Sequence, residues 1–279
     1  MDDIDILRIG EIRYANCTPL YATLKKLSDC RDYAFIPGEP ASLNALLASG
    51  GIDVSSSSSV EYARHWYDYL VIPEVSISSR GSVGSILLFS KKPIESLGGE
   101  KIAVSSASAT SVVLLKVLLR FHYGIGADLV PRAPVLKTML DGTAAALLIG
   151  DEALKERIAV GDAPGLLVYD LGKIWQEFSG LPFVYALWMV RADSASRAPS
   201  LAAKFKEEII KAKEISTADY GEISLASPES AWMGRENLIA YWRAMSYDLG
   251  DAHIGGLSKF FELAGKVGEV PHIPALRFL

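Results

Sequence analysis

Side chains with small hydroxyl and amide groups gather in this sequence where an apolar strand is expected to end and a helix to begin. Three such places are the turn at Asn16, the serine run Ser55–Ser59 and the loop Ser105–Ser111. Backbone N–H groups in the first turn of a helix lack intrahelical partners, and the helix dipole makes that end positive, so these turns favour an anion. We therefore predict that Thr110 and Ser111 hold a carboxylate or a phosphate.

The segment Lys101–Gly124 has the clearest pattern of this kind. An apolar run at Ile102–Val104 predicts a strand, the hydroxyl-rich loop follows it, and the apolar stretch Val112–Phe121 predicts a helix that Gly124 ends. Helix capping is the alternative role for the loop, because capping is the common use of Ser and Thr before a helix.

The same order of strand, hydroxyl-rich turn and helix recurs earlier in the chain. Ile52–Val54 is expected to be a short buried strand, the serine run to be a turn, and Val60–Tyr67 to be a helix. Asn16 follows a strand predicted over Ile4–Ile9, where its amide would face the space above the sheet. Its alternative role is that of a turn former bonded to its own backbone.

Strands and helices alternate through most of the chain, which predicts an α/β fold with mostly parallel sheets flanked by helices. The long apolar strands Val83–Ser90 and Phe183–Val190 bracket a middle section, and we expect them to cross between two lobes. We assign residues 1–88 and 190–279 to one lobe and residues 89–189 to the other. Ligands bind at the carboxyl ends of strands in such sheets, so the ligand cleft should lie between the lobes.

The last third of the chain is predicted to be helical over residues 195–215, 228–247 and 255–265, where apolar residues recur at helical spacing. The stretch after Gly124 is polar and contains proline, and we expect it to be a loop. Two hydroxyl-rich turns from different lobes would face one cleft. That arrangement favours binding over capping and suits a ligand with two anionic groups.

Composition excludes several classes of function. The chain has 279 residues, 22% of them charged, and a net charge of −5, which argues against non-specific binding to nucleic acid or to an anionic membrane surface. Its two cysteines and four histidines show no metal-ligand spacing, so we expect no metal site. The acidic start Met1–Asp5 has no apolar core, and no apolar run is long enough to span a bilayer, so we expect a soluble cytoplasmic protein.

Several long ungapped segments resemble one enzyme family, the chorismate dehydratases of the futalosine route to menaquinone. The segments are IGEIRYANCTPLY (9–21), DVSSSSSVEYAR (53–64), SISSRGSVGSILLFS (76–90), SSASATSVVLLKVLL (105–119), LLIGDEAL (147–154) and YDLGKIWQEFSGLPFVYALWMV (169–190). They cover most of the first two thirds of the chain. The resemblance implies a type II periplasmic-binding-protein-like fold with two lobes and a cleft between them.

The resemblance also implies the reaction. It is dehydration of chorismate, a dianion, to 3-[(1-carboxyvinyl)oxy]benzoate without metal or organic cofactor, so that the partner is a small-molecule substrate. Asn16 matches the asparagine that the family places at the reacting centre. The remaining residues that the resemblance places at the substrate are Ser57, Ser58, Thr110 and Ser111 for the carboxylates, and Gly84 and Ser85 for the floor of the site.

Two groups are candidates for the base that takes the proton. Asp151 follows a strand at the cleft edge, and its alternative role is to cap the next helix. The substrate's own enolpyruvyl carboxylate needs no protein base, and we favour it. A sister family, the dihydroxynaphthoate synthases, carries a catalytic histidine where this chain has Gly150, so that activity is disfavoured.

Two other functions remain as alternatives. The fold would suit a solute-binding receptor of a transporter, but the expected lack of a signal sequence argues against it. A ligand-sensing protein for a small dicarboxylate is the other, and no basic stripe supports a DNA-binding partner. The sequence leaves the oligomeric state open between monomer and dimer.

Overall fold

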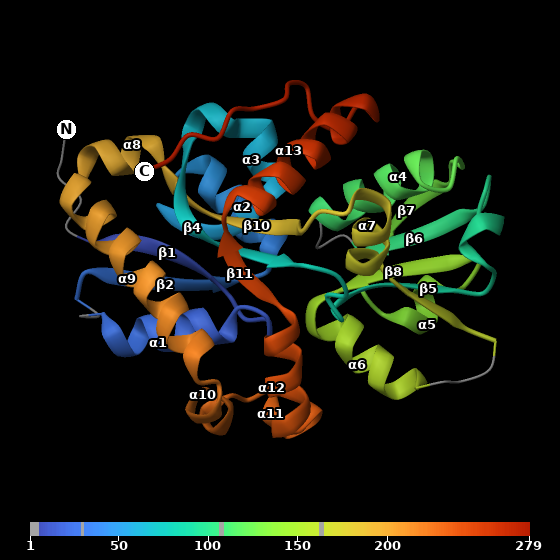
Figure 1. Ribbon diagram of the computed structural model, residues 1–279, viewed down its shortest axis with the longest axis horizontal. Coiled ribbons are helices and arrows are strands. Elements are labelled where there is room, and N and C mark those ends of the chain that lie inside the picture. The colour runs from blue at the N-terminus through green and yellow to red at the C-terminus, as the bar shows by residue number, and fades with distance from the viewer. Residues whose placement is uncertain (1–5, 29–30, 106–108, 162–164) are drawn as a thin grey trace.

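The computed structural model describes residues 6–28, 31–105, 109–161 and 165–279, which form two lobes that lie side by side (Figure 1). Each lobe is built on one sheet with helices on its faces. The N-terminal and C-terminal parts of the chain build lobe 1, and the middle part builds lobe 2.

Lobe 1 contains a sheet of six strands in the described part of the chain. Their spatial order is β11 (Ser246–Leu249), β4 (Tyr69–Ser79), β10 (Phe183–Arg191), β3 (Val54–Ser58), β1 (Leu7–Ile12) and β2 (Tyr33–Gly38). Strand β1 runs parallel to β2 and β3, because helices connect these strands and return the chain to the same edge. Strand β10 re-enters from lobe 2 and is antiparallel to β3 and β4.

Lobe 2 contains a smaller sheet, with five strands among the described residues. Their order is β7 (Asp128–Arg132), β6 (Lys101–Ser105), β8 (Ala145–Ile149), β5 (Ile86–Ser90) and β9 (Leu167–Asp170). Strand β6 is parallel to β7 and β8, whereas β5 is antiparallel to β8 and β9. Both sheets are therefore mixed, and the prediction of mostly parallel sheets is wrong in that respect.

The helices of lobe 1 come from both ends of the chain. They are α1 (Thr18–Leu27), α2 (Pro40–Ser49), α3 (Ser59–His65), α8 (Ala192–Arg197), α9 (Pro199–Ala218), α10 (Gly221–Ala226), α11 (Ser230–Met233), α12 (Arg235–Ala244) and α13 (Asp251–Lys266). The helices of lobe 2 are α4 (Thr110–Phe121), α5 (Leu136–Met139), α6 (Gly150–Val160) and α7 (Leu171–Ser179). Short 3₁₀ turns occur at Trp66–Asp68 and Ile94–Ser96.

An apolar core continues from one lobe into the other. Trp175 of α7 packs its ring against Phe183 of β10, with 5.2 Å between the ring centroids, and Phe183 lies 4.8 Å from Phe260 of α13. These large rings are fully buried. Their burial removes apolar surface of both lobes from water, which stabilises the contact between the lobes.

The chain crosses between the lobes at residues 80–85 and 180–182, not along the two strands expected to cross. Strand β5 lies wholly in the sheet of lobe 2, and β10 lies wholly in the sheet of lobe 1. The expected boundaries at 88/89 and 189/190 therefore fall inside strands. The expected strand over 83–90 begins only at Ile86, because the N–H groups of Val83 and Gly84 bond to a side chain, Asp170, instead of to a neighbouring strand.

Three local predictions differ from the structure. The serine run is mostly strand β3 rather than a turn, since β1 and β10 supply its backbone partners. The loop expected after Gly124 contains strand β7, whose proline is tolerated at the edge of the sheet. The helix expected over 228–247 is divided into α11, α12 and β11. In the loop Ser105–Ser111, residues 106–108 lie outside the described part.

No helix of the described chain combines the length and apolar character that a membrane crossing requires.

Candidate active site

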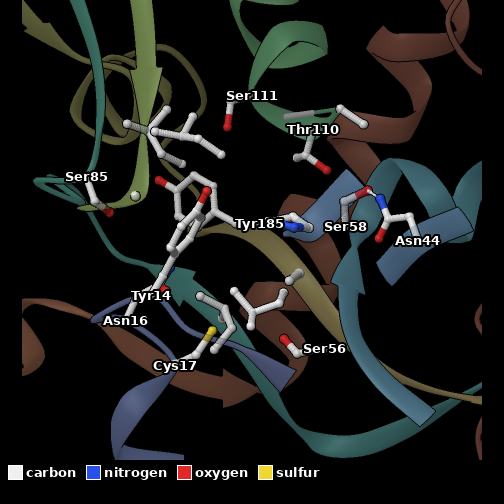
Figure 2. A pocket seen from close by; sticks show the side chains of 18 residues that line it. Tyr14, Asn16, Cys17, Asn44, Ser56, Ser58, Ser85, Thr110, Ser111 and Tyr185 are labelled. Atoms are coloured by element: carbon white, nitrogen blue, oxygen red, sulfur yellow. Dashed lines mark hydrogen bonds between the residues drawn. The ribbon is translucent and has the colours of Figure 1, made fainter. Parts of the chain in front are cut away.

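A pocket opens where the two lobes meet (Figure 2), and its empty space, counted with the open solvent at its mouth, is about 620 Å³. Lobe 1 contributes Ile12, Tyr14, Asn16, Cys17, Pro40, Asn44, Ser56, Ser58, Ile77, Tyr185 and Ala186. Lobe 2 and the crossing segment contribute Ser85, Ile86, Ala109, Thr110, Ser111, Ile149 and Gly150. The described lining is a mixture of apolar, hydroxyl and amide groups, and it contains no charged side chain.

One end of the pocket, which we call the hydroxyl end, is formed by Asn44, Ser58, Thr110 and Ser111. Here the N-termini of α3 and α4 meet across the lobes. Ser58 caps α3, since its Oγ accepts the N–H of Glu61 at 3.2 Å, and the Thr110 Oγ1 accepts the N–H of Val60 at 3.2 Å. Capping is thus one role of Ser58, as the alternative interpretation held.

The hydroxyl end also carries an amide that the sequence did not reveal. Asn44 of α2 donates from Nδ2 to the Ser58 Oγ at 3.2 Å, and its Oδ1 accepts a hydrogen bond from the Ser57 hydroxyl. The Ser58 oxygen accepts from both Asn44 and the backbone, so its own proton is directed elsewhere. That proton can serve an acceptor in the pocket.

The electrostatic character of the hydroxyl end comes from helix termini. Helix α4 begins with no acidic residue in its first turn and no side-chain cap, and its first intrahelical bond runs from Val113 N to Ala109 O. In any helix the N–H groups of the first turn lie before the first intrahelical bond and point out of the N-terminus. Together with the dipole of this helix of 12 residues, they favour an anion at Thr110 and Ser111.

The opposite end, which we call the Asn16 end, is formed by Tyr14, Asn16, Cys17 and Ser85. The Oδ1 atom of Asn16 is buried and has no hydrogen-bond partner in the structure. The Oγ of Ser56, between the two ends, is buried and unpartnered as well. Buried polar atoms are normally paired, so these two mark where a ligand would supply the missing partners.

Side chains from distant elements hold the backbone beside Asn16. The Ala15 N–H donates to the Asp151 Oδ1 at 2.9 Å, and the Trp242 Nε1 donates to the Ala15 carbonyl at 2.6 Å. The Tyr247 hydroxyl donates to the Asn16 carbonyl at 2.9 Å. Helix α12 and strand β11 thus reach the site, although the sequence offered no sign of it.

Ser85 lies at the crossing between the lobes. Its Oγ accepts a hydrogen bond from the Tyr241 hydroxyl at 2.8 Å, which leaves the Ser85 proton for another acceptor. Its carbonyl accepts the N–H of Gly150 at 2.8 Å. The neighbouring Gly84 donates its N–H to Asp170 at 2.7 Å and does not line the pocket.

Gly150 allows the lobes to approach each other at the Asn16 end. Its φ is +61°, a conformation that other residues rarely adopt, and a Cβ there would lie 2.7 Å from the Tyr14 ring. The Tyr14 hydroxyl donates to Glu39 at 2.8 Å. A side chain at position 150 would therefore force the ring of Tyr14 to move.

Asp151 supports the site from behind rather than lining it. Burial raises the pKa of its carboxyl group to about 6, the hydrogen bond from the Ala15 N–H lowers this pKa, and the charge of Glu229 raises it further. Glu229 is also buried, and its Oε1 accepts a hydrogen bond from Thr18 at 2.9 Å.

The structure brings together most of the residues singled out in the sequence. Those that line the pocket are Asn16, Ser58, Ser85, Thr110 and Ser111. Those that stand outside the lining are Ser57, Gly84 and Asp151. Ser57 is bonded to Asn44 of the lining, Asp151 accepts from the backbone next to Asn16, and Gly84 precedes Ser85 in the chain and bonds to Asp170. The lining residues that sequence reasoning missed include Tyr14, Asn44, Ser56 and Tyr185.

Two of the missed residues carried a local signal. Asn44 lies in α2, one of the helices that begin at the carboxyl ends of the parallel strands, and Tyr14 is two residues from Asn16. Tyr185 sits on β10, where an apolar strand gave no reason to single it out. Its hydroxyl is paired with that of Ser79 at 3.0 Å, and burial raises the pKa of this phenol.

Among the described residues, no group of three or more His, Cys, Asp and Glu side chains is arranged to hold a metal ion. The described lining supplies hydrogen-bond donors, hydroxyl groups and helix dipoles, which are the groups that stabilise an anion.

A family model and two curated relatives match this chain. The family model described as menaquinone biosynthesis matches residues 7–266. A chorismate dehydratase of Thermus thermophilus is 34% identical over 198 residues, which cover 67% of this chain and 70% of that protein. A chorismate dehydratase of Campylobacter jejuni is 32% identical over 181 residues, and these span slightly less than two thirds of each chain, 63% of this one and 64% of that one.

Solved structures show the same fold. A protein of Archaeoglobus fulgidus matches with a TM-score of 0.76 at 20% identity, over 95% of this chain and 99% of that one. The alkanesulfonate-binding protein SsuA of Xanthomonas axonopodis matches with a TM-score of 0.71 at 12% identity, over 99% and 98%. At these identities the likeness shows the fold alone, and it confirms the predicted periplasmic-binding-protein-like architecture.

Proposed function

The chain belongs to the menaquinone biosynthesis family, and from that membership we propose that it is a chorismate dehydratase. The proposed reaction converts chorismate to 3-[(1-carboxyvinyl)oxy]benzoate and water, which makes the protein a hydro-lyase. The observation that carries the proposal is the pocket between the lobes, whose described lining offers hydroxyl groups, an amide and helix N-termini to an anion.

The reaction removes the proton on C3 and the hydroxyl on C4 of the chorismate ring. The ring becomes aromatic, which provides the driving force, and the enolpyruvyl ether stays in place. The protein must hold the ring and stabilise charge on the departing hydroxyl. Asn16 is proposed for that role, because its side chain lines the pocket, where Nδ2 can donate to the departing oxygen. Its Oδ1, which has no partner among the described residues, can accept the proton of the C4 hydroxyl.

One carboxylate of the substrate is proposed to bind at the hydroxyl end. Ser58, Thr110 and Ser111 line that end, and the dipole of α4 points its positive end there. Ser57 contributes through Asn44, to which its hydroxyl is bonded. Ser85 would form the floor under the ring, with Gly84 fixing the loop that carries it.

The proton on C3 is proposed to go to the substrate's own enolpyruvyl carboxylate. The described lining contains no carboxylate and no histidine that would serve as a protein base. Asp151 is the alternative base, and its Oδ1 already accepts the Ala15 N–H. No cofactor enters the proposal, and its partner is the chorismate dianion, with the reaction expected in the cytoplasm.

The test is to mix the purified protein with chorismate and to follow the ultraviolet spectrum and the product mass. A product that has lost one water and kept the enolpyruvyl group supports the proposal. Binding without any change to chorismate would instead favour the alternative, a solute-binding protein or sensor for a small dicarboxylate. If chorismate neither binds nor turns over, chorismate is excluded as the ligand.

A further inference from the structure

We propose that Asp151, Trp242 and Tyr247 form a clamp on the Ala15–Asn16 backbone, and that this clamp positions Asn16 for catalysis only when the two lobes are closed. The inference rests on the proposed role of Asn16 in chorismate dehydration. The inference makes Asp151 a positioning residue rather than the base of the reaction. It also gives α12 and β11 a role in holding the backbone beside Asn16.

The clamp engages three polar groups on two successive residues. Asp151 accepts the Ala15 N–H at 2.9 Å, Trp242 donates to the Ala15 carbonyl at 2.6 Å, and Tyr247 donates to the Asn16 carbonyl at 2.9 Å. A buried backbone group that loses its partner is costly, so each bond favours one orientation of its peptide group, and together they fix this short segment. The direction of the Cα–Cβ bond of Asn16 follows from that orientation.

The three side chains come from elements far apart in the chain. Trp242 on α12 and Tyr247 on β11 belong to lobe 1, as does the Ala15–Asn16 peptide itself. Asp151 belongs to α6 of lobe 2. It is the member that crosses between the lobes, so opening the pocket would break its bond and leave the other two intact.

The rest of the clamp is buried and hydrogen-bonded. Trp242 is fully buried, and Tyr247 and Tyr241 are buried beside it. Tyr241, the neighbour of Trp242 on α12, bonds to the Ser85 hydroxyl at 2.8 Å. Helix α12 therefore holds both the Ala15 carbonyl next to Asn16 and the Ser85 hydroxyl, and Asn16 and Ser85 both lie at the Asn16 end.

Ionisation of Asp151 strengthens the clamp, because a carboxylate is a better acceptor for an N–H group than a neutral carboxylic acid. Burial raises the pKa of this carboxyl group to about 6, so the group loses its charge in mildly acidic solution. The titratable and charged groups that act on it or respond to it are Glu229 just before α11, Lys155 and Glu152 on α6, Tyr14 and Cys17 on either side of Asn16, and Tyr241 on α12.

Two substitutions at Asp151 separate positioning from proton removal. Asp151→Asn keeps an oxygen that can accept the Ala15 N–H, so kcat near pH 7.5 should stay within about threefold of the wild type. Asp151→Ala removes the acceptor, and kcat should fall at least about tenfold with little change in KM, since small misplacements of a reacting group are costly. A general base would instead lose most of its turnover in both variants.

The pH profile adds a second readout that a purely structural residue would not move. The kcat of the wild type should decline by about threefold at most, to the level of Asp151→Asn, as the pH falls through about 6, the pKa of Asp151, and Asp151→Asn should lack that decline. An acid limb unchanged in Asp151→Asn would show that another group titrates.

Tyr247→Phe tests the other side of the clamp without changing lobe 2. Its kcat should fall several-fold at constant KM, and the double variant with Asp151→Ala should lose less than the product of the two single losses, because both bonds hold the same short backbone segment. Tyr33→Phe is the matched control, since its hydroxyl bonds to Glu208 on α9 and not to any residue of the pocket, and it should keep wild-type kcat.

Amide hydrogen exchange at Ala15 tests the clamp without any turnover. Exchange should be slow in the wild type and in Asp151→Asn, and faster in Asp151→Ala. A wild type that does not dehydrate chorismate would overturn the proposed function, and the exchange result would still decide the clamp. Wild-type kcat in both Asp151→Ala and Tyr247→Phe, or equal Ala15 exchange in all proteins, would overturn the clamp.

Discussion

The two ends of the pocket differ in how their polar groups are satisfied. At the hydroxyl end, Ser58 and Thr110 already accept N–H groups of α3, and Asn44 bonds to both Ser57 and Ser58. At the Asn16 end, the backbone is held on every side while the Oδ1 of Asn16 has no partner. One end is thus satisfied by the fold, and the other presents an unsatisfied group on a fixed support.

This difference indicates that the two ends have different roles, one in binding and one in the reaction. Groups that are already paired can add a bond to a ligand without a change of structure, which suits uniform binding of a substrate carboxylate. An unpaired amide on a rigid backbone suits an interaction that forms with the departing group in the transition state. Substitutions at the hydroxyl end should therefore change KM, and substitutions at the Asn16 end should change kcat.

The largest effect is expected for Asn16→Ala. Removing one preorganised donor at a reacting centre costs about 10²–10³ in kcat, and the fold should be unaffected because the clamp bonds to backbone atoms. Steady-state kinetics with chorismate measure the loss, and circular dichroism with thermal unfolding controls for folding. A kcat of Asn16→Ala near that of the wild type would contradict the claim that the chemistry takes place at the Asn16 end.

The next effect concerns stability at the Asn16 end. The raised pKa of Asp151 means that the folded protein binds a proton more tightly than the unfolded chain between about pH 4 and 6, so stability falls as the carboxyl ionises through that window. Asp151→Asn should be more stable than the wild type at pH 7.5, by at most about 3 kcal/mol for a shift of this size. The gain should vanish near pH 4.

Urea unfolding of both proteins at several pH values measures that difference. A gain that stays constant from pH 4 to 8 would mean that titration of Asp151 does not cause it. Glu152→Gln, on the same helix and without a bond to Ala15, is the control for a general change of charge.

Thr110→Val sharpens the comparison from the hydroxyl end. It keeps the shape of the side chain and removes the acceptor of the Val60 N–H together with a donor to the substrate. We expect KM to rise about tenfold, which corresponds to roughly 1.4 kcal/mol, while kcat changes less than threefold. A fall in kcat at constant KM would place the chemistry at this end.

The smallest effect is expected for Ser58→Ala. Loss of the cap on α3 should lower the free energy of unfolding by about 1 kcal/mol, with a modest rise in KM. Chemical denaturation and kinetics measure the two quantities. An unchanged stability would show that the bond from Glu61 N to Ser58 contributes nothing to the fold.

The parts of this site that the sequence could predict are those that depend on local pattern. Strand β6 and helix α4 follow from hydrophobic periodicity, and the cap role of Ser58 follows from its place before α3. The serine run was misjudged because its strand is stabilised by pairing with β1 and β10, which is non-local. Buried serines in a strand give no signal that distinguishes them from a turn.

The clamp could not be predicted at all. Trp242 and Tyr247 lie 227 and 231 residues from their partners in the sequence, and only the folded chain brings them to Ala15 and Asn16. Asp151 was correctly placed near the cleft by its position after β8. Its contact with a backbone N–H rather than with the pocket depends on how closely Gly150 lets the lobes approach.

The most direct test of the division between the two ends is a crystal structure of the protein with 3-[(1-carboxyvinyl)oxy]benzoate bound. The account predicts the ring in the pocket between the lobes, the carbon that lost the hydroxyl beside the Asn16 amide, and one carboxylate against Ser58 and Thr110. A product bound outside this pocket, or one with its carboxylates at Asn16 and its reacting carbon at the hydroxyl end, would contradict it.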